Sequence, residues 1–99
     1  MKRRIQQTSL QAYYDIKSSL GARQREILSF LEREYPETYT NNEIAVGVNL
    51  PINCVTPRVY ELRKKGFVRA YGKRHCAVTG RLAIEWGLDF NREKQMSFF

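Results

Sequence analysis

The sequence predicts a mainly α-helical fold that ends in a small β-hairpin. Up to Gly66 the apolar residues recur at the three- and four-residue spacing of helices. After Gly66 they alternate with polar residues, as they do in strands. The last helical segment, residues 53–65, is apolar on one side and polar and cationic on the other. Such a helix can pack on a small core with one side and lie in a DNA groove with the other.

The positive charge is concentrated in one part of the chain. The 99 residues carry a net charge of +7. Residues 58–81 hold eight Lys and Arg residues and a single acid, Glu61, so the rest of the chain is neutral. A segment of one sign focuses its electric field toward a polyanion. The charge pattern therefore predicts nucleic acid as the partner.

The length and composition are those of one domain with one small core. No apolar run approaches the ~20 residues of a membrane span, and no apolar segment follows the basic N-terminus as in a secretory signal. We therefore expect no membrane partner and a cytoplasmic location. Cys54 and Cys76 fit free thiols in a reducing compartment, although a single disulfide between them is left open.

The N-terminal part predicts an extra helix in front of the bundle. Residues 1–7 are polar and basic, which indicates a flexible N-terminus. Thr8 and Gln11 have the spacing of a capping box, and the helix would run from Ser9 to about Lys17. Its broad aromatic stripe either packs against its own domain or forms the contact of a homodimer.

The next helix is predicted from Ala22 to Tyr35. Either Gly21 or Ser19 begins it, and Pro36 ends it because the residue before a proline is pushed out of the helical conformation. Its outward-facing residues have mixed charge signs, which is typical of a solvated surface.

The following two helices have the spacing of a helix-turn-helix. Thr40 and Glu43 form a capping box for a short helix that ends near Asn49. After a tight turn, Asn53 is expected to cap the helix 53–65. Because Pro57 cannot donate a helical hydrogen bond, a regular helix that starts at Pro57 with Thr56 as its cap is the alternative. This layout places a recognition helix second.

A basic hairpin follows the recognition helix, which is the position of a wing. One strand is expected over residues 67–71 and its partner over residues 81–86, with Trp86 in the core. Residues 72–80 would form a projecting loop. A short segment at residues 38–40 is expected to make one or two ladder bonds. The winged-helix domain would thus cover residues 8–86, and residues 87–99 form a C-terminal tail whose role is left open.

The runs TNNEIAVGVNLPINCVTPRVYELRKKGFV and GKRHCAVTGRLAIEW together resemble small winged helix-turn-helix proteins of bacteriophages and prophages. The resemblance covers about residues 8–86. It implies a three-helix bundle plus wing, with an extra N-terminal helix. It also implies a DNA-binding regulatory role in the cytoplasm of a bacterial host. Cys54 departs from the pattern, because similar proteins often have an arginine there.

Two kinds of DNA contact are expected. Paired hydrogen bonds near the start of the helix read bases, as Arg does with guanine and Asn with adenine. Lys and Arg neutralise phosphates and release counterions. In the recognition helix the expected contacts are Asn53, Thr56, Arg58, Tyr60, Lys64 and Lys65, and in the wing they are Arg69, Lys73, Arg74, His75 and Arg81.

Three of the helix residues have a second interpretation. Asn53 either reads a base or is used to cap its own helix. Arg58 either reads guanine or pairs with Glu61, three residues later. Tyr60 either contacts a phosphate or shields the first helix of the motif.

The wing residues also have two predicted modes of binding. Lys73, Arg74 and His75 either enter the minor groove or follow the phosphate backbone. Arg74 is the expected minor-groove probe, because narrow grooves attract arginine.

Other chemistry has no support in the sequence. His75, Cys76 and Cys54 lack the spacing of a zinc site, so no metal is expected. The single histidine has no identifiable catalytic partner, and there is no phosphate-binding glycine loop. We therefore expect no enzyme and no cofactor. The competing hypothesis is a winged-helix interaction module of a phage replication or assembly complex. The aromatic N-terminal helix and the end of the tail, which could also serve a homodimer, favour it.

Overall fold

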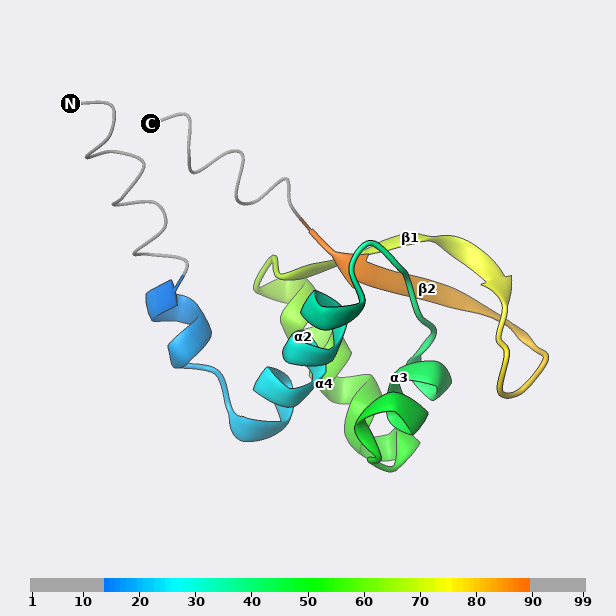
Figure 1. The fold of residues 1–99 in the computed structure, drawn as a ribbon, viewed down its shortest axis with the longest axis horizontal. Helices are drawn as coiled ribbons and strands as arrows, with labels where there is room; N and C mark the ends of the chain where they lie inside the picture. Colours follow the sequence, from blue (N-terminus) through cyan, green and yellow to red (C-terminus); the bar gives the residue numbers. More distant parts are fainter. Residues whose placement is uncertain (1–13, 90–99) are drawn as a thin grey trace.

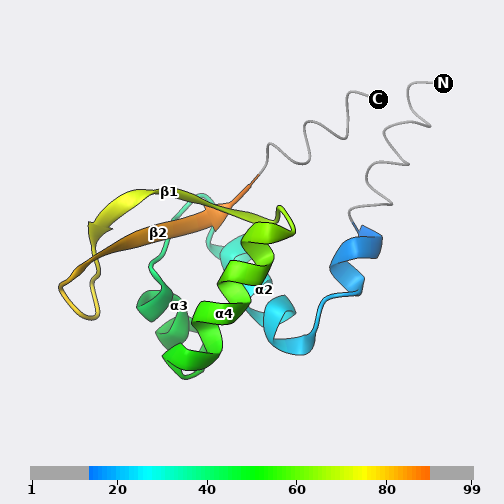
Figure 2. The ribbon, with the colours of Figure 1, turned by 180° about the vertical axis from the view of Figure 1, so that it is seen from behind.

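The computed structural model describes residues 14–89, which form a helical bundle followed by an antiparallel hairpin. The elements are α2 (Ala22–Glu34), α3 (Asn41–Val48), α4 (Ile52–Lys64), β1 (Val68–His75) and β2 (Leu82–Leu88). A helical segment over residues 14–18 precedes α2. The hairpin lies across one end of the bundle and extends past α3 (Figures 1 and 2). This confirms the predicted three-helix bundle with a wing.

The predictions for the chain ends are tested only in part. The N-terminus that was predicted to be flexible, the predicted start of the first helix and residues 90–99 of the tail lie outside the described residues. Within the described part, Ile16 packs against the core, and Lys17 Nζ forms an ion pair with Glu32 of α2 at 2.9 Å. This end of the first helix therefore packs on its own domain. No helix within residues 14–89 is long and apolar enough to cross a membrane.

One core joins the three helices to the base of the hairpin. In α4, Val55, Val59 and Leu62 are buried, as the helical spacing predicted. Trp86 is buried in the same core, also as predicted. The core members from the other elements include Ile27, Leu28, Phe30 and Leu31 of α2, Ile44 of α3, and Phe67, Val68 and Leu88.

The predicted end of the second helix is wrong by one residue, with a consequence for packing. The helix ends at Glu34, and Tyr35 takes an extended conformation before Pro36. Tyr35 therefore leaves the apolar face of the helix and is 54% exposed, whereas Phe30 packs in the core. At the other end, Gly21 and not Ser19 begins the helix, and its N–H donates to Gln24 Oε1 at 3.0 Å.

The predicted start of the recognition helix is also wrong. The helix begins at Ile52 after Pro51, so neither Asn53 nor Thr56 is its cap. The Pro51 carbonyl accepts hydrogen bonds from the N–H groups of Cys54 at 2.9 Å and Val55 at 3.2 Å. The backbone thus closes the first turn without a side chain. Pro57 is accommodated within the helix.

The short helix α3 has the ends that the sequence predicted. Thr40 and Glu43 form the reciprocal capping box, with Thr40 N–H donating to Glu43 Oε1 at 3.0 Å and Glu43 N–H donating to Thr40 Oγ1 at 3.3 Å. Asn49 follows the helix in the left-handed conformation, with a φ of 58°.

The hairpin is longer and its loop shorter than predicted. Strand β1 starts at Val68 and continues to His75, so only residues 76–81 connect the two strands. The pairing register shifts between Ala70 and Gly72, which makes Tyr71 a bulge residue. The ladder bonds expected at residues 38–40 are present as an isolated bridge: Tyr39 and Trp86 exchange two backbone hydrogen bonds, of 2.8 and 2.7 Å.

The close approach of α3 to α2 predicts a size limit at Gly47. A Cβ atom on Gly47 would overlap the ring of Phe30. We expect Gly47→Val to lower the free energy of unfolding by about 1–3 kcal/mol through overpacking, as measured by urea denaturation. Val46→Ala, at the exposed neighbouring position, is the control and should change it by less than about 0.5 kcal/mol. A Gly47→Val protein as stable as the wild type would contradict this packing.

Candidate nucleic-acid interface

The outer side of α4 presents a continuous stripe of exposed side chains. In Figure 2 α4 lies in front of α2, with its outer side uncovered. Each residue turns the helix by about 100°, so the side chains of this stripe fall within about 60° of Asn53 around the axis. They lie opposite the buried Val55, Val59 and Leu62. The members of this outer stripe are Asn53, Thr56, Pro57, Tyr60 and Lys64, all of them exposed.

Arg63 adjoins the outer stripe and was missing from the predicted contacts. It is exposed, and it lies one turn after Tyr60. The spacing of three residues from Tyr60 is the sequence signal that would have identified it. In the same turn, Lys64 Nζ lies 5.3 Å from the centre of the Tyr60 ring, a cation–π contact. Lys65 follows the helix as its C-cap.

Arg58 lies away from the outer stripe. Its guanidinium binds the Glu61 carboxylate through two hydrogen bonds, of 2.8 and 2.9 Å. Gln24 of α2 donates to the same carboxylate at 2.7 Å. These bonds, that of Arg58 first, lower the pKa of Glu61. Of the two interpretations of Arg58, pairing with Glu61 is the one observed.

The two faces of the hairpin differ in character. Residues directly opposite each other in an antiparallel pair share a face. Lys73 pairs with Ile84 and His75 with Leu82, so these four side chains form the outer face of the hairpin. Arg74 pairs with Ala83 on the inner face, toward α3. The outer face is exposed and includes Leu82, whose side chain is 62% exposed.

Arg74 is half-buried on the inner face of the hairpin, where it is bound to groups of the same chain. Its guanidinium donates to both oxygens of Glu43, at 2.6 and 2.8 Å, and to the carbonyl of Thr38 at 2.9 Å. Nε of the same guanidinium lies 3.5 Å from Glu85 Oε1. The expectation that Arg74 probes the minor groove does not fit this position, because the charge and donors of Arg74 are already used. Arg74 meets these partners because it lies on the inner face of the hairpin, a position that the sequence alone does not show.

The Glu43 carboxylate connects the wing to the start of α3. Besides the two bonds from Arg74, it accepts the N–H of Thr40 and, at 2.7 Å, the N–H of Ala77 in the wing loop. The bonds from Arg74 lower its pKa most, burial opposes them, and the backbone donors add to them, so that the pKa of Glu43 is about 2. Next to it, Thr40 Oγ1 donates to the buried sulfur of Cys76 at 3.0 Å.

The other predicted wing residues are exposed but spread out. The Arg69 guanidinium lies 4.7 Å from the centre of the Tyr71 ring, near the base of the hairpin. His75 Nδ1 lies 3.1 Å from the carbonyl oxygen of Gly80 at the loop. Arg81 is exposed at the far end of the loop, and Lys73 lies on the outer face.

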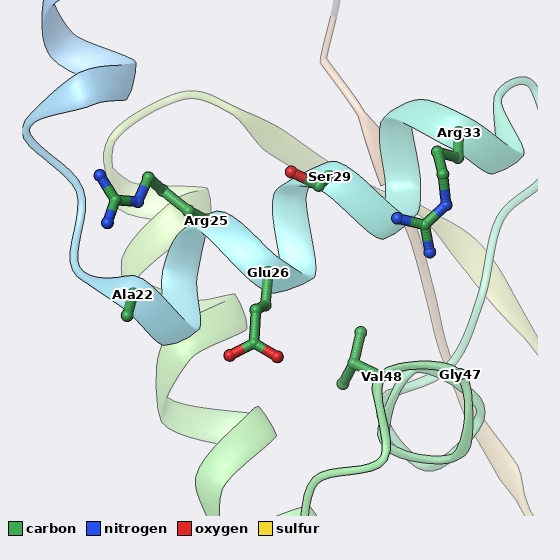
Figure 3. A pocket seen from close by; sticks show the side chains of 7 residues that line it. All are labelled: Ala22, Arg25, Glu26, Ser29, Arg33, Gly47 and Val48. Carbon is green, nitrogen blue, oxygen red and sulfur yellow. The ribbon is translucent and has the colours of Figure 1, made fainter.

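A separate hollow lies between α2 and the end of α3. This open cleft has a volume of about 620 Å³, and Glu26 and Arg33 extend from α2 toward Val48 in it (Figure 3). Its lining includes no residue of α4 or of the hairpin. The cleft is therefore distinct from the outer stripe. Within residues 14–89 no three His, Cys, Asp or Glu side chains gather as a metal site would require.

Comparisons with solved structures support this fold. A "possible transcriptional regulator" from Methanosarcina mazei Go1 superposes with a TM-score of 0.65 at 10% sequence identity, over 90% of this chain and 73% of that one. AbfR in its disulfide-formed state superposes with a TM-score of 0.56 at 23% identity, over 95% of this chain. The chain spans 62% of the length of AbfR. No protein-family model and no curated protein sequence matches the chain.

The bonds between Arg74 and Glu43 predict different behaviour for two neighbouring cations. Arg74→Ala leaves the mostly buried Glu43 carboxylate without its charged partner, so we expect a loss of about 2–3 kcal/mol in the free energy of unfolding. Lys73→Ala removes an outward cation and should change stability by less than about 0.5 kcal/mol. Urea denaturation of both variants measures this contrast. Equal stabilities would show that the Glu43–Arg74 pair does not hold the wing.

The low pKa of Glu43 predicts acid sensitivity. Because the folded pKa of about 2 lies below the ordinary value of 4.5, the stabilisation is complete above pH 4.5 and is lost as the pH falls toward 2. We expect the stability difference between wild type and Glu43→Gln to shrink by about 2–3 kcal/mol between about pH 6 and pH 2. Glu26→Gln, which alters an exposed pair with Arg23, is the control and should show a change below about 0.5 kcal/mol. A pH-independent difference for Glu43→Gln would refute the assignment.

Proposed function

We propose that this chain binds double-stranded DNA with a preference for sequence and acts as a small transcriptional regulator. The phage or prophage setting rests on the sequence resemblance. Helix α4 would lie in the major groove, and the wing would lie on the flanking backbone or in the minor groove. The observation that carries the proposal is the uncovered outer stripe of α4, which ends in cations and is followed directly by a basic hairpin. The fold shared with a protein named as a possible transcriptional regulator supports it.

The cations left on the surface suit phosphate contacts. Arg58 and Arg74 are bound to acids of the same chain, so they contribute little to a positive surface. The other exposed cations near α4 and the hairpin are Arg63, Lys64, Lys65, Arg69, Lys73 and Arg81, with His75 beside them. Four to six phosphate contacts would give a log–log salt slope of about −4 to −5.

A single domain of this size reads only a few base pairs, so useful specificity requires more than one copy on the DNA. We propose a homodimer through the N-terminal helix or the C-terminal tail as one way to provide it. In a dimer of this kind, the two recognition helices would enter half-sites about one helical turn apart.

One observation favours the second candidate function, a protein-interaction module of a phage replication or assembly complex. The outer face of the hairpin is apolar as well as basic, since Leu82, Ile84 and the nearby Val78 are exposed. Exposed apolar patches of this kind often mark protein contacts. The exposed cations at the end of α4 have no role in that alternative, which is why we place DNA binding first.

Titration with a random-sequence duplex at two salt concentrations tests the proposal. We expect binding that weakens steeply with salt, and we expect Arg63→Ala to reduce the magnitude of the log–log slope by about 1. Arg33→Ala, in the cleft between α2 and α3, removes the same charge away from the outer stripe and should leave the slope unchanged. Absent or salt-insensitive binding would refute the proposal and favour the interaction module.

A further inference from the structure

We infer that α4 selects A·T base pairs, with Asn53 reading adenine and Thr56 contacting the methyl group of the paired or adjacent thymine. This inference rests on the proposed DNA binding. It names the class of target sequence and the two residues that determine it, and it replaces the expectation that Arg58 reads guanine.

The first step is the direction of Arg58. It lies five residues after Asn53, which places it about 140° around the helix axis. Thr56 and Pro57, by contrast, lie within about 60° of Asn53. When the outer stripe faces the floor of the groove, Arg58 therefore points toward the start of α2. Its position beside Gly21, Ala22 and Gln24 in a small hollow agrees with this direction.

The second step is the bonding of Arg58. Glu61 takes two hydrogen bonds from its guanidinium and a third from Gln24, so the pair belongs to the contact between α4 and α2. An exposed ion pair alone contributes only about 0–1 kcal/mol and could be broken by DNA. The direction of the side chain is the stronger constraint, because releasing Arg58 from Glu61 would not turn it onto the outer stripe.

The third step is that Asn53 is available. Helix α4 begins at Ile52, so Asn53 is within the helix and does not cap it. Its side chain is exposed, and within residues 14–89 no hydrogen bond holds it. An asparagine amide pairs with adenine N6 and N7 in the major groove, whereas guanine presents two acceptors at the corresponding positions. The amide oxygen of Asn53 would face O6 of guanine without a proton between them.

The fourth step is the charge along the outer stripe. Its first two turns hold Asn53, Thr56 and Pro57, which are neutral. Lys64 of the outer stripe and the adjoining Arg63 lie about 15 Å along the axis from Asn53, because each residue adds about 1.5 Å. Recognition helices contact bases through their N-terminal residues. The cationic side chains that could read guanine thus lie at the C-terminal end of α4. The N-terminal end, which contacts bases, holds an amide and a hydroxyl with a methyl group.

The expected discrimination follows from these contacts. A bidentate Asn–adenine pair contributes about 1–3 kcal/mol, which corresponds to about a 5- to 150-fold preference over guanine. The methyl contact of Thr56 is smaller and would give a preference of a few-fold for thymine over uracil.

Selection of bound sequences from a random duplex pool, performed with the full chain, tests the inference. We expect A·T pairs at the positions that α4 contacts. Asn53→Ala should lower the preference for adenine over guanine by about 5- to 150-fold and should still fold, since alanine is favourable at an exposed helix position. Arg58→Ala is the matched control and should leave the selected sequence unchanged.

A second measurement isolates Thr56. Replacing the selected thymines by deoxyuridine should weaken binding of the wild type a few-fold and leave binding of Thr56→Ser unchanged, because serine keeps the hydroxyl but has no methyl group. Selection of G·C pairs that disappears in Arg58→Ala would overturn the inference while leaving DNA binding intact. Loss of binding to every duplex in the pool would instead overturn the proposed function, and the inference with it.

Discussion

The wing and the start of α3 meet at one carboxylate, that of Glu43. An isolated two-stranded hairpin is marginally stable in water. The base of this hairpin reaches the core through Val68, Trp86 and Leu88, and Cys76 is buried at the start of the loop. Toward its tip the hairpin is held by Glu43, which accepts hydrogen bonds from Arg74 in β1 and from Ala77 in the loop. The same carboxylate completes the capping box of α3, so one group bonds to both the wing and the start of the helix-turn-helix.

The charge of the chain is distributed differently in space than in sequence. In sequence, residues 58–81 contain only one acid. In space, Glu43 and Glu85 come from outside that segment to meet Arg74, and Glu61 meets Arg58. Arg58 and Arg74, two of the eight cations, are therefore paired with acids in the folded protein. Those that remain exposed lie at the end of α4 and along the hairpin, which separates the cationic surface from the neutral first turns of the recognition helix.

The sequence predicted best what depends on neighbours along the chain. The core stripe of α4, the capping box of Thr40 and Glu43, and the burial of Trp86 follow from local spacing and hydrophobicity, and all are confirmed. The i,i+3 pairing of Arg58 with Glu61 was foreseen as an alternative for the same reason. The pairing of Arg74 with Glu43 joins residues 31 positions apart and depends on where the hairpin folds. No local pattern contains that information.

The wrong start of α4 shows a second limit of local reasoning. Asparagine is a favoured cap, so Asn53 was a natural choice, but the cap is Pro51, whose carbonyl accepts the first hydrogen bonds of the helix. The two choices differ by only two residues, yet they decide the role of Asn53: a cap has its amide committed, whereas a residue inside the first turn presents it outward. The assignment of Asn53 as a reader thus depends on the Pro51 carbonyl, which closes the first turn and leaves that amide free of any bond within the described part of the chain.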